Sequence, residues 1–295
     1  MPQNSENRAG VSHSLTVPLL IPAVHANRCR FFAILVLMKH LFLILCAVLL
    51  CSCSNSRQGA DFPLVDYHVH LKGDFTYEKA VEHSRLSGIK YGIALNCGLG
   101  FPTETDSAAF AWFDSMKDSP FLLAMQAEGR EWMTLFSQAV IEKFDYVFTD
   151  AMTYTDESGK RVRLWMMDEV SVPDPQEFMD DLVGRIETIF TSEPVDIYVN
   201  PTFLPECIAA DYDRLWTRAR MLKVIDAAKK NNIAIEINNR YRIPSEKFIK
   251  LAKRKGVKFA FGTNNSDSNM GDLDYCLLMK KRCGLKEDDM LWVKK

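Results

Sequence analysis

Apolar and polar positions alternate in a regular series from about residue 65 to residue 282. Short runs rich in Val, Ile, Phe and Tyr are each followed by a longer stretch with apolar residues at i, i+3 and i+4. The first pattern is typical of buried strands and the second of amphipathic helices. Strands are predicted over residues 65–71, 91–97, 121–127, 146–152, 196–202, 233–239 and 258–264.

The helical pattern follows each of these strands. Helices are predicted over residues 77–87, 107–117, 132–142, 176–191, 213–230, 245–255 and 271–282. Strands that alternate with helices of this length imply a parallel sheet with crossover helices. Seven such units in about 230 residues favour a closed or nearly closed barrel. A doubly wound sheet is the alternative, but no glycine-rich loop follows the first strand.

One polar insertion interrupts the alternation after the fourth predicted strand, over residues 153–175. It contains the turn-like sequence Tyr154-Thr155-Asp156-Glu157-Ser158-Gly159 and predicts a hairpin. From its place after a strand, it should overhang the end of the sheet where loops carry function. It serves either as a lid or substrate wall, or as a hairpin packed on the rim.

The region before the barrel has the pattern of an export signal. Met38-Lys39-His40 is followed by the apolar run 41–50 and then by Cys51-Ser52-Cys53. A basic start, an apolar stretch of about ten residues and a small-residue boundary make a secretory signal. The apolar run is too short to span a bilayer. Four segments are predicted: residues 1–37 as a non-structural extension or mis-assigned start, 38–53 as the signal, 54–62 as a tether and 63–295 as one domain.

Residues 50–53 resemble a bacterial lipobox, in which Cys53 is the cysteine that becomes lipidated after cleavage. Cys51 departs from that pattern, which more often has a small aliphatic or hydroxyl residue there. The resemblance implies a lipoprotein of the bacterial cell envelope that touches the membrane through its lipid anchor only. An ordinary secretory peptide without lipid is the alternative.

The whole chain has 47% hydrophobic and 25% charged residues, which is typical of a globular protein and favours an ordinary globular domain after the leader. The net charge of −2 and the lack of a basic stripe exclude a nucleic-acid partner. No C-x-x-C sequence occurs, which argues against a zinc knuckle. Buried thiols are expected, and an exported protein could also form one disulfide. The cysteines of the domain are Cys97, Cys207, Cys276 and Cys283.

Polar side chains gather where the predicted strands end, which in such barrels is the face that carries chemistry. Any single Asn or Asp there is explained by turn formation. As a set they predict a polar pocket at the carboxyl ends of the strands. Its members are His68, His70, Asn96, Cys97, Glu128, Arg130, Glu131, Asp150, Met152, Asn200, Glu236, Asn238, Asn239, Arg240, Thr263, Asn264, Asn265, Ser266 and Asp267.

The sequence Asp66-Tyr67-His68-Val69-His70 predicts half of a metal site. Residues i and i+2 of a strand point to the same face, so both imidazoles should aim at one point. Two neutral imidazoles are suitable ligands for Zn, Fe or Mn. The alternative is a structural role, with His68 and His70 hydrogen-bonded to Asp66 or Asn264.

Several motifs resemble those of the PHP family, named for polymerase and histidinol phosphatase. Asp66–Leu71 resembles its opening motif, Gly129-Arg130-Glu131 its G-x-E motif, and Ala234–Asn238 and residues 257–267 its last two strands. The resemblance implies an α/β fold, a (β/α)7-type distorted TIM barrel, and a metal-dependent hydrolase acting on phosphate esters. It also implies that Glu131 is a metal-bridging carboxylate.

This chain departs from the family at several ligand positions, because Asn96, Asn200, Asn264 and Ser266 stand where the family has His or Asp. Asn is neutral and a poor ligand for transition metals. At most one divalent ion is therefore expected, either Zn, Mn or Fe. The ligands predicted for it are His68, His70 and Glu131.

Two hypotheses follow. In the first, the chain is a lipid-anchored hydrolase in which the ion activates water and Asp267 takes the proton. In the second, the barrel has lost catalysis and binds a small polar ligand or a partner protein. Both expect a polar or phosphorylated ligand. The residues predicted to bind it are Asn96, Asn200, Glu236, Arg240 and Asn264, and Arg130 and Arg242 are further candidates for a phosphate.

Overall fold

The computed structural model describes residues 62–265 and 269–294. Gln58–Lys295 forms one compact unit. Every core residue that is described lies within it, and the barrel closes within it, so this unit contains what its folding requires. The predicted extension and signal, Cys53 and residues 54–61 of the tether lie outside the described residues; Phe62, the last tether residue, is described and is buried in the core. No helix of the described part is long and apolar enough to cross a bilayer.

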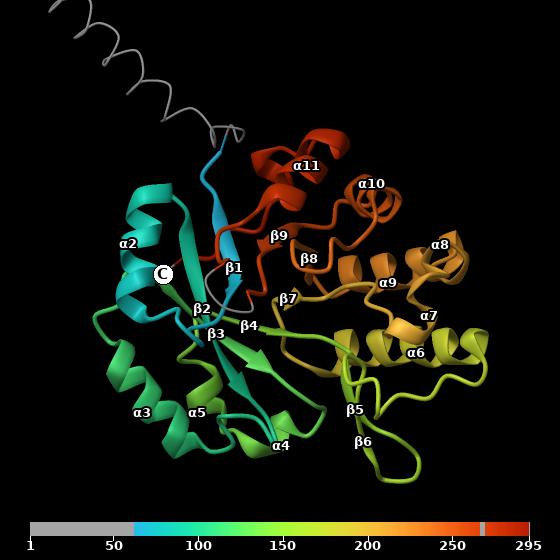
Figure 1. Ribbon diagram of the computed structural model, residues 1–295, viewed down its shortest axis with the longest axis horizontal. Helices are drawn as coiled ribbons and strands as arrows, with labels where there is room; N and C mark the ends of the chain where they lie inside the picture. Colours follow the sequence, from blue (N-terminus) through green and yellow to red (C-terminus); the bar gives the residue numbers. More distant parts are fainter. Residues whose placement is uncertain (1–61, 266–268, 295) are drawn as a thin grey trace, which may run out of the picture. The chain divides into compact units, whose positions relative to one another are not determined.

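Seven parallel strands form a closed barrel, as the sequence pattern predicted (Figure 1). The first strand pairs with the second and also with the last, which closes the sheet. Their order around the barrel is β1 (Val65–Val69), β2 (Lys90–Cys97), β3 (Leu122–Ala127), β4 (Tyr146–Thr149), β7 (Ile197–Tyr198), β8 (Ala234–Asn238) and β9 (Phe259–Gly262).

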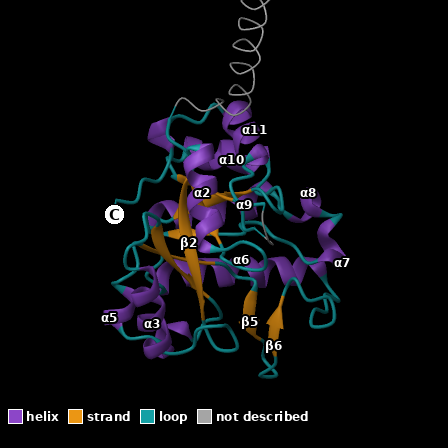
Figure 2. Cartoon of the chain, turned by 60° about the vertical axis from the view of Figure 1, so that its left-hand side comes forward, coloured by secondary structure: helices purple, strands orange, loops and turns teal. Residues whose placement is uncertain are grey.

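Helices surround this barrel and cover its outer face (Figures 1 and 2). The longer ones are α2 (Tyr77–Ser87), α3 (Asp106–Met116), α6 (Pro175–Ser192), α9 (Arg218–Lys230), α10 (Glu246–Arg254) and α11 (Asp274–Cys283). The shorter ones are α4 (Trp132–Leu135), α5 (Gln138–Ile141), α7 (Glu206–Ala209), α8 (Tyr212–Leu215) and the 3-10 helix η1 (Glu287–Asp289).

Two predicted helices are each broken into two. Residues 132–142 form α4 and α5, and residues 213–230 form α8 and α9. The breaks fall at Ser137 and Thr217, whose backbones are extended. The Thr217 side chain accepts a hydrogen bond from Arg220 N, which starts α9 as an N-cap. The apolar periodicity continues across both breaks, so it could not reveal them.

The outer core lies between the strands and the helices and contains most of the buried apolar side chains. Helix α9 illustrates why the sequence folds this way. Its buried residues Met221, Val224, Ile225 and Ala228 follow the i, i+3, i+4, i+7 pattern. Burying each large apolar side chain contributes about 1.5–3 kcal/mol to folding.

A smaller apolar cluster fills the interior of the barrel below the polar site. Its members come from alternate strand positions, as expected for a closed sheet. They are Val65, Tyr67, Ala94, Leu122, Ala124, Tyr146, Phe148, Ile197, Val199, Ala234 and Ala260. The pairing register of β1 shifts between Asp66 and Val69. Such an irregularity allows His68 to point inward although its neighbour Tyr67 also belongs to the interior.

The insertion forms the predicted hairpin, built of β5 (Thr153–Thr155) and β6 (Arg161–Arg163), which projects from the barrel (Figure 2). Asp156 Oδ1 shapes its turn by accepting hydrogen bonds from the backbone N–H groups of Ser158 and Lys160, both at 2.9 Å. Gly159 supplies the positive φ of 82° that the turn requires.

The cysteines of the described part are all free thiols, so the disulfide that export would allow is not formed there. Cys97, Cys276 and Cys283 are buried, as expected, whereas Cys207 is exposed.

Candidate functional site at the carboxyl ends of the strands

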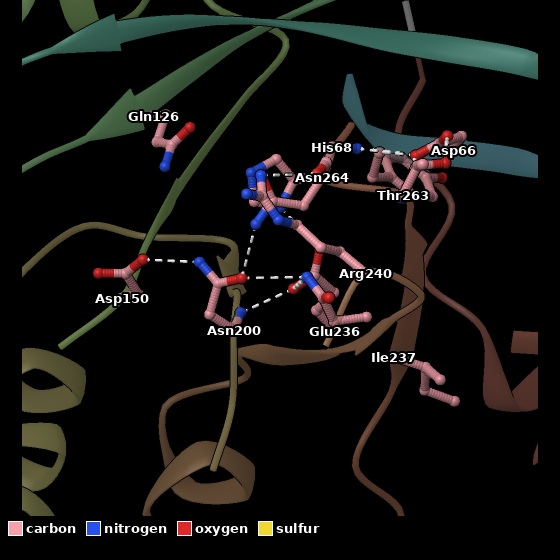
Figure 3. Close-up of polar contacts among 12 residues, drawn as sticks. Asp66, His68, Gln126, Asp150, Asn200, Glu236, Ile237, Arg240, Thr263 and Asn264 are labelled. Atoms are coloured by element: carbon pink, nitrogen blue, oxygen red, sulfur yellow. Dashed lines mark hydrogen bonds and ion pairs between the residues drawn. The ribbon is translucent and has the colours of Figure 1, made fainter. Parts of the chain in front are cut away.

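His68 and Glu236 form the centre of the polar site (Figure 3). His68 Nδ1 lies 2.7 Å from Glu236 Oε1, and both side chains are about 1% exposed. His68 Nε2 is buried and has no hydrogen-bond partner among the described residues. The ring packs against Phe148, with 4.7 Å between ring centroids. The site therefore contains an oriented imidazole with one unused nitrogen.

Glu236 is held in place by backbone and amide donors. Its Oε2 accepts hydrogen bonds from Asn200 N at 2.6 Å and Asn238 Nδ2 at 2.9 Å. The carboxylate also lies directly against β9, because a Cβ added at Gly262 would come within 2.0 Å of Glu236 Oε1. The glycine at position 262 is thus what lets Glu236 reach His68.

Three asparagines form a connected amide group at the ends of β7, β8 and β9. Asn200 Oδ1 accepts from Asn238 Nδ2 at 3.0 Å and from Asn264 Nδ2 at 2.9 Å. Asn200 Nδ2 donates to Asp150 Oδ2 at 2.8 Å. Asn200 and Asn264 both have a φ of 47°, a left-handed conformation that Asn tolerates better than most residues. These amides are therefore bonded to one another and to the buried carboxylates.

Glu128 and Asp150 are two further buried carboxyl groups of the site. Asn200 bonds Asp150 through its side-chain Nδ2 and Glu236 through its backbone N–H. Glu128 Oε1 accepts hydrogen bonds from Asn96 Nδ2 at 3.1 Å and Gln126 Nε2 at 2.9 Å. Burial and the nearby charge of Asp150 raise the pKa of Glu128 to about 8. Burial also raises the pKa of Asp150, against the effect of its hydrogen bond from Asn200. At neutral pH, Glu128 therefore holds a proton.

His70 lies beside His68, as the i, i+2 rule predicted, with 5.2 Å between the ring centroids. Burial lowers the pKa of His70 well below its usual value, and the neighbouring His68 adds to this shift. The imidazole of His70 is therefore neutral at pH 7. The side chain of Asn265 forms two hydrogen bonds with the backbone of His70: it accepts one from His70 N at 2.7 Å and donates one to His70 O at 2.9 Å.

Asp66 has a structural role at the start of the site. Its carboxylate is fully buried and accepts hydrogen bonds from the backbone N–H groups of Thr263 at 2.8 Å and Gly271 at 3.0 Å. It also accepts from His68 N at 3.2 Å, so it contacts the backbone of His68 and not its ring. The expected imidazole bond to Asp66 or Asn264 is therefore replaced by the bond to Glu236.

Glu131 does not join the histidines, which corrects the predicted ligand set. Its carboxylate forms an ion pair with Arg161 of β6 and accepts from Arg130 N at 2.9 Å. Burial raises the pKa of Glu131, but these hydrogen bonds and the charge of Arg161 outweigh it, and the pKa falls below its usual value. Glu131 therefore attaches its loop to the hairpin.

The described residues contain no group of three or more His, Cys, Asp or Glu side chains arranged to hold a metal ion. The remaining predicted participant, Asp267, lies outside them. Among the described residues, His68 Nε2 has no partner, whereas the carboxylates of Asp150 and Glu236 are bonded to amides, so these donors do not converge as the predicted zinc, manganese or iron site requires.

Arg130 is also engaged within the protein and is not free to bind a phosphate. Its guanidinium donates to Glu193 Oε1 at 2.6 Å and to Thr149 Oγ1 at 2.8 Å. Arg242 packs over the Tyr275 ring at 4.9 Å. Arg240 is exposed, its guanidinium lies over the Tyr241 ring at 5.3 Å, and it donates one hydrogen bond, to Asn264 O at 3.5 Å. Arg240 is thus the predicted anion ligand with unused donors at the mouth of the barrel.

A cavity of about 670 Å³ adjoins Arg240. It lies between the segment that follows β6 and the loops that follow β7 and β8. Its walls include Trp165, Phe203 and Tyr241. The barrel mouth therefore combines a buried polar centre with an adjacent open cavity.

Comparisons with known proteins support the fold. No protein-family model and no curated protein matches the sequence. Among solved structures, the histidinol phosphate phosphatase of Lactococcus lactis, determined with Zn, L-histidinol and phosphate, is similar with a TM-score of 0.52 and 14% identity. The match covers 76% of this chain and 94% of that one. A citrate lyase from Burkholderia xenovorans matches with a TM-score of 0.38 and 9% identity, over 75% of this chain and 77% of that chain. At these identities the likeness concerns the fold, and the first match agrees with the barrel that the PHP-like motifs implied.

Both Glu128 and Glu131 were expected at the end of the third strand, and the motif resemblance gave the metal-bridging role to Glu131, whereas Glu128 is the one that is buried among the site residues. The signal that identifies Glu128 is the alternation along β3, in which Leu122, Ala124 and Gln126 face the interior. Continuing this two-residue period past the end of β3 points Glu128 inward as well.

Proposed function

We propose that this barrel binds a small anionic ligand, such as a phosphorylated metabolite, at the carboxyl ends of its strands without a resident metal. The observation that carries this proposal is the amide group centred on Asn200. Neutral amides bond to Asp150 and Glu236, so these carboxylates are already satisfied and are not directed at an ion. The exposed guanidinium of Arg240 supplies the charge that an anion requires.

Hydrolysis of a phosphate ester is a second candidate, favoured by His68 alone. Its Nδ1 is fixed by Glu236 and its Nε2 has no described partner. An imidazole held in this way can accept or donate a proton at Nε2. Because this nitrogen is buried, the ligand would have to displace neighbouring groups to reach it.

We also propose that the protein is attached to the cell envelope through a lipid on Cys53. The basis for this is the lipobox-like sequence at residues 50–53 and the polar tether that follows. The barrel would then meet its ligand on the outer side of the cytoplasmic membrane.

Binding and metal content can be measured on the unit 58–295. Isothermal titration with phosphate and with 4-nitrophenyl phosphate should show binding that Arg240→Gln weakens at least tenfold. The matched control is Arg242→Gln, which should leave the affinity unchanged because Arg242 does not line the cavity beside Arg240. Equal binding by the parent and Arg240→Gln would contradict the proposal.

A measurement of bound metal tests whether the metal site predicted from the sequence exists. After incubation with Zn, Mn or Fe and removal of free ions, the parent and His68→Ala/His70→Ala should retain the same small amount. One equivalent of metal in the parent that is lost in the variant would overturn the metal-free proposal. Turnover of 4-nitrophenyl phosphate that His68→Gln abolishes would favour the hydrolase.

A further inference from the structure

The cavity beside Arg240 has walls of different character. The segment after β6 contributes Leu164, Trp165 and Met167, and the loop after β7 contributes Phe203 and Leu204. These side chains make one side of the cavity apolar. A volume of about 670 Å³ lies within the range of pockets for small molecules and is too small for a folded partner.

The apolar wall contains two large side chains that are exposed and do not pack in the core. Trp165 is 37% exposed and Met167 is 71% exposed, and neither belongs to a buried cluster. Both follow the projecting hairpin. Large apolar side chains that line a cavity and face water are typical of a binding surface.

The polar groups of the cavity come from the loops that follow the barrel strands. Arg240 follows β8, and Thr202 follows β7 with its hydroxyl bonded to Tyr212 Oη at 2.6 Å. Arg240 has no carboxylate partner among the described residues. Glu206, the acidic residue of the lining, is exposed at the start of α7 and would repel an anion from that side. The anionic end of a ligand therefore belongs at Arg240, next to the strand ends.

We infer that the cavity binds an amphipathic anion, whose charged group contacts Arg240 and whose short alkyl or aromatic part lies against Trp165 and Met167. The charged group is a phosphate monoester or a carboxylate. This inference rests on the proposed binding of an anion at Arg240 and adds that an apolar body contributes to affinity.

The test is a chain-length series titrated into the unit 58–295 by calorimetry. Burial of each methylene should tighten binding about threefold, so hexyl phosphate should bind on the order of thirtyfold more tightly than propyl phosphate. Hexanoate distinguishes a carboxylate from a phosphate ligand. The Trp165→Ala/Met167→Ala variant should lower the affinity for hexyl phosphate about tenfold and leave inorganic phosphate binding unchanged.

A matched control is Leu86→Ala on α2, which removes a side chain that is 68% exposed and does not line the cavity. It should bind the whole series like the parent. Equal affinities for propyl and hexyl phosphate, or an unchanged length dependence in the double variant, would overturn the inference while leaving anion binding intact. Binding of 1-hexanol with no binding of phosphate would instead refute the anion at Arg240 and keep the apolar cavity.

Discussion

Glu236 Oε1 lies 2.7 Å from His68 Nδ1, although the two residues are 168 positions apart in the chain. Glu236 Oε2 accepts two N–H donors, and with Oε1 as the acceptor the imidazole Nδ1 is the donor in this pair. The lone pair of the imidazole is then on Nε2. In metal sites a carboxylate commonly orients a histidine in this way. Here the orienting pair is present, while Asn200, Asn238 and Asn264 bond to one another and to Asp150 and Glu236.

The first prediction concerns Glu236→Gln. An amide has one acceptor oxygen, so its NH2 group must face at least one of the donors from His68, Asn200 and Asn238. Leaving such a buried donor unsatisfied should lower the free energy of unfolding by about 2 kcal/mol. Urea denaturation at pH 7 measures this. Glu82→Gln on the exposed face of α2 is the control, and parent-like stability of Glu236→Gln would show that the pair is not held as described.

The second prediction concerns pH. Burial raises the pKa of Glu128 from 4.5 to about 8, so between these values the folded state binds more protons than the unfolded state. Stability from this group is therefore fully present below pH 4.5 and is lost as the pH rises through about 8. His70 acts in the opposite direction, but only below its unfolded pKa of about 6.5.

The stabilities of the parent and of Glu128→Gln should accordingly be compared between pH 6.5 and pH 8.5. The parent should lose stability over this range, and Glu128→Gln should lose less. Thermal unfolding in buffers of matched ionic strength gives the difference, with Glu82→Gln expected to follow the parent. Parallel curves for the parent and Glu128→Gln would show that Glu128 does not titrate in this window.

The third prediction concerns the close approach of β9 to the site. In Gly262→Ala the new Cβ would meet Glu236 Oε1 at 2.0 Å and His68 Cβ at 2.9 Å. Because donors on several sides hold Glu236, the strain should lower the free energy of unfolding by about 2–3 kcal/mol. Gly184→Ala in α6 is a matched control, since no atom lies within 4 Å of its Cβ, and it should stabilise the helix slightly. Equal stabilities of the two variants would be incompatible with this packing.

The fourth prediction concerns attachment. Cys53→Ser should move the protein from the membrane fraction to the soluble fraction of the cells, because the thiol that carries the lipid is removed. Membrane and soluble fractions are compared by immunoblotting, with Cys51→Ser as the control that keeps the modified position. A processed Cys53→Ser protein that stays with the membrane would refute the lipid anchor.

The strands and their order could be predicted from the sequence because each depends on local alternation. The helix breaks at Ser137 and Thr217 could not, since apolar spacing continues through them. For the site, the pairing of His68 and His70 follows from two adjacent strand positions. The partner of His68 does not, because Glu236 reaches it only when the barrel closes. Sequence reasoning assigned Glu236 to ligand binding, whereas its described contacts are internal.

Glu131 shows the limit of motif resemblance. The sequence Gly129-Arg130-Glu131 suggested a metal-bridging carboxylate, but Arg161 of the hairpin pairs with it. Nothing in the local sequence relates residue 131 to a hairpin thirty residues later. His68, Asp150, Asn200, Glu236, Asn238 and Asn264 of the predicted set lie together, whereas Glu131 does not, and the role of each depends on contacts between distant strands.

Closure of the barrel also constrains how the protein is made. Asp66 on the first strand accepts the backbone N–H of Thr263, 197 residues further along, and Tyr67 Oη donates to Leu291 O. The ring of strands therefore cannot be completed until nearly the whole polypeptide has left the ribosome. Pairing over so long a loop is slow to form. The barrel of the emerging chain thus stays open until β9 has been synthesised.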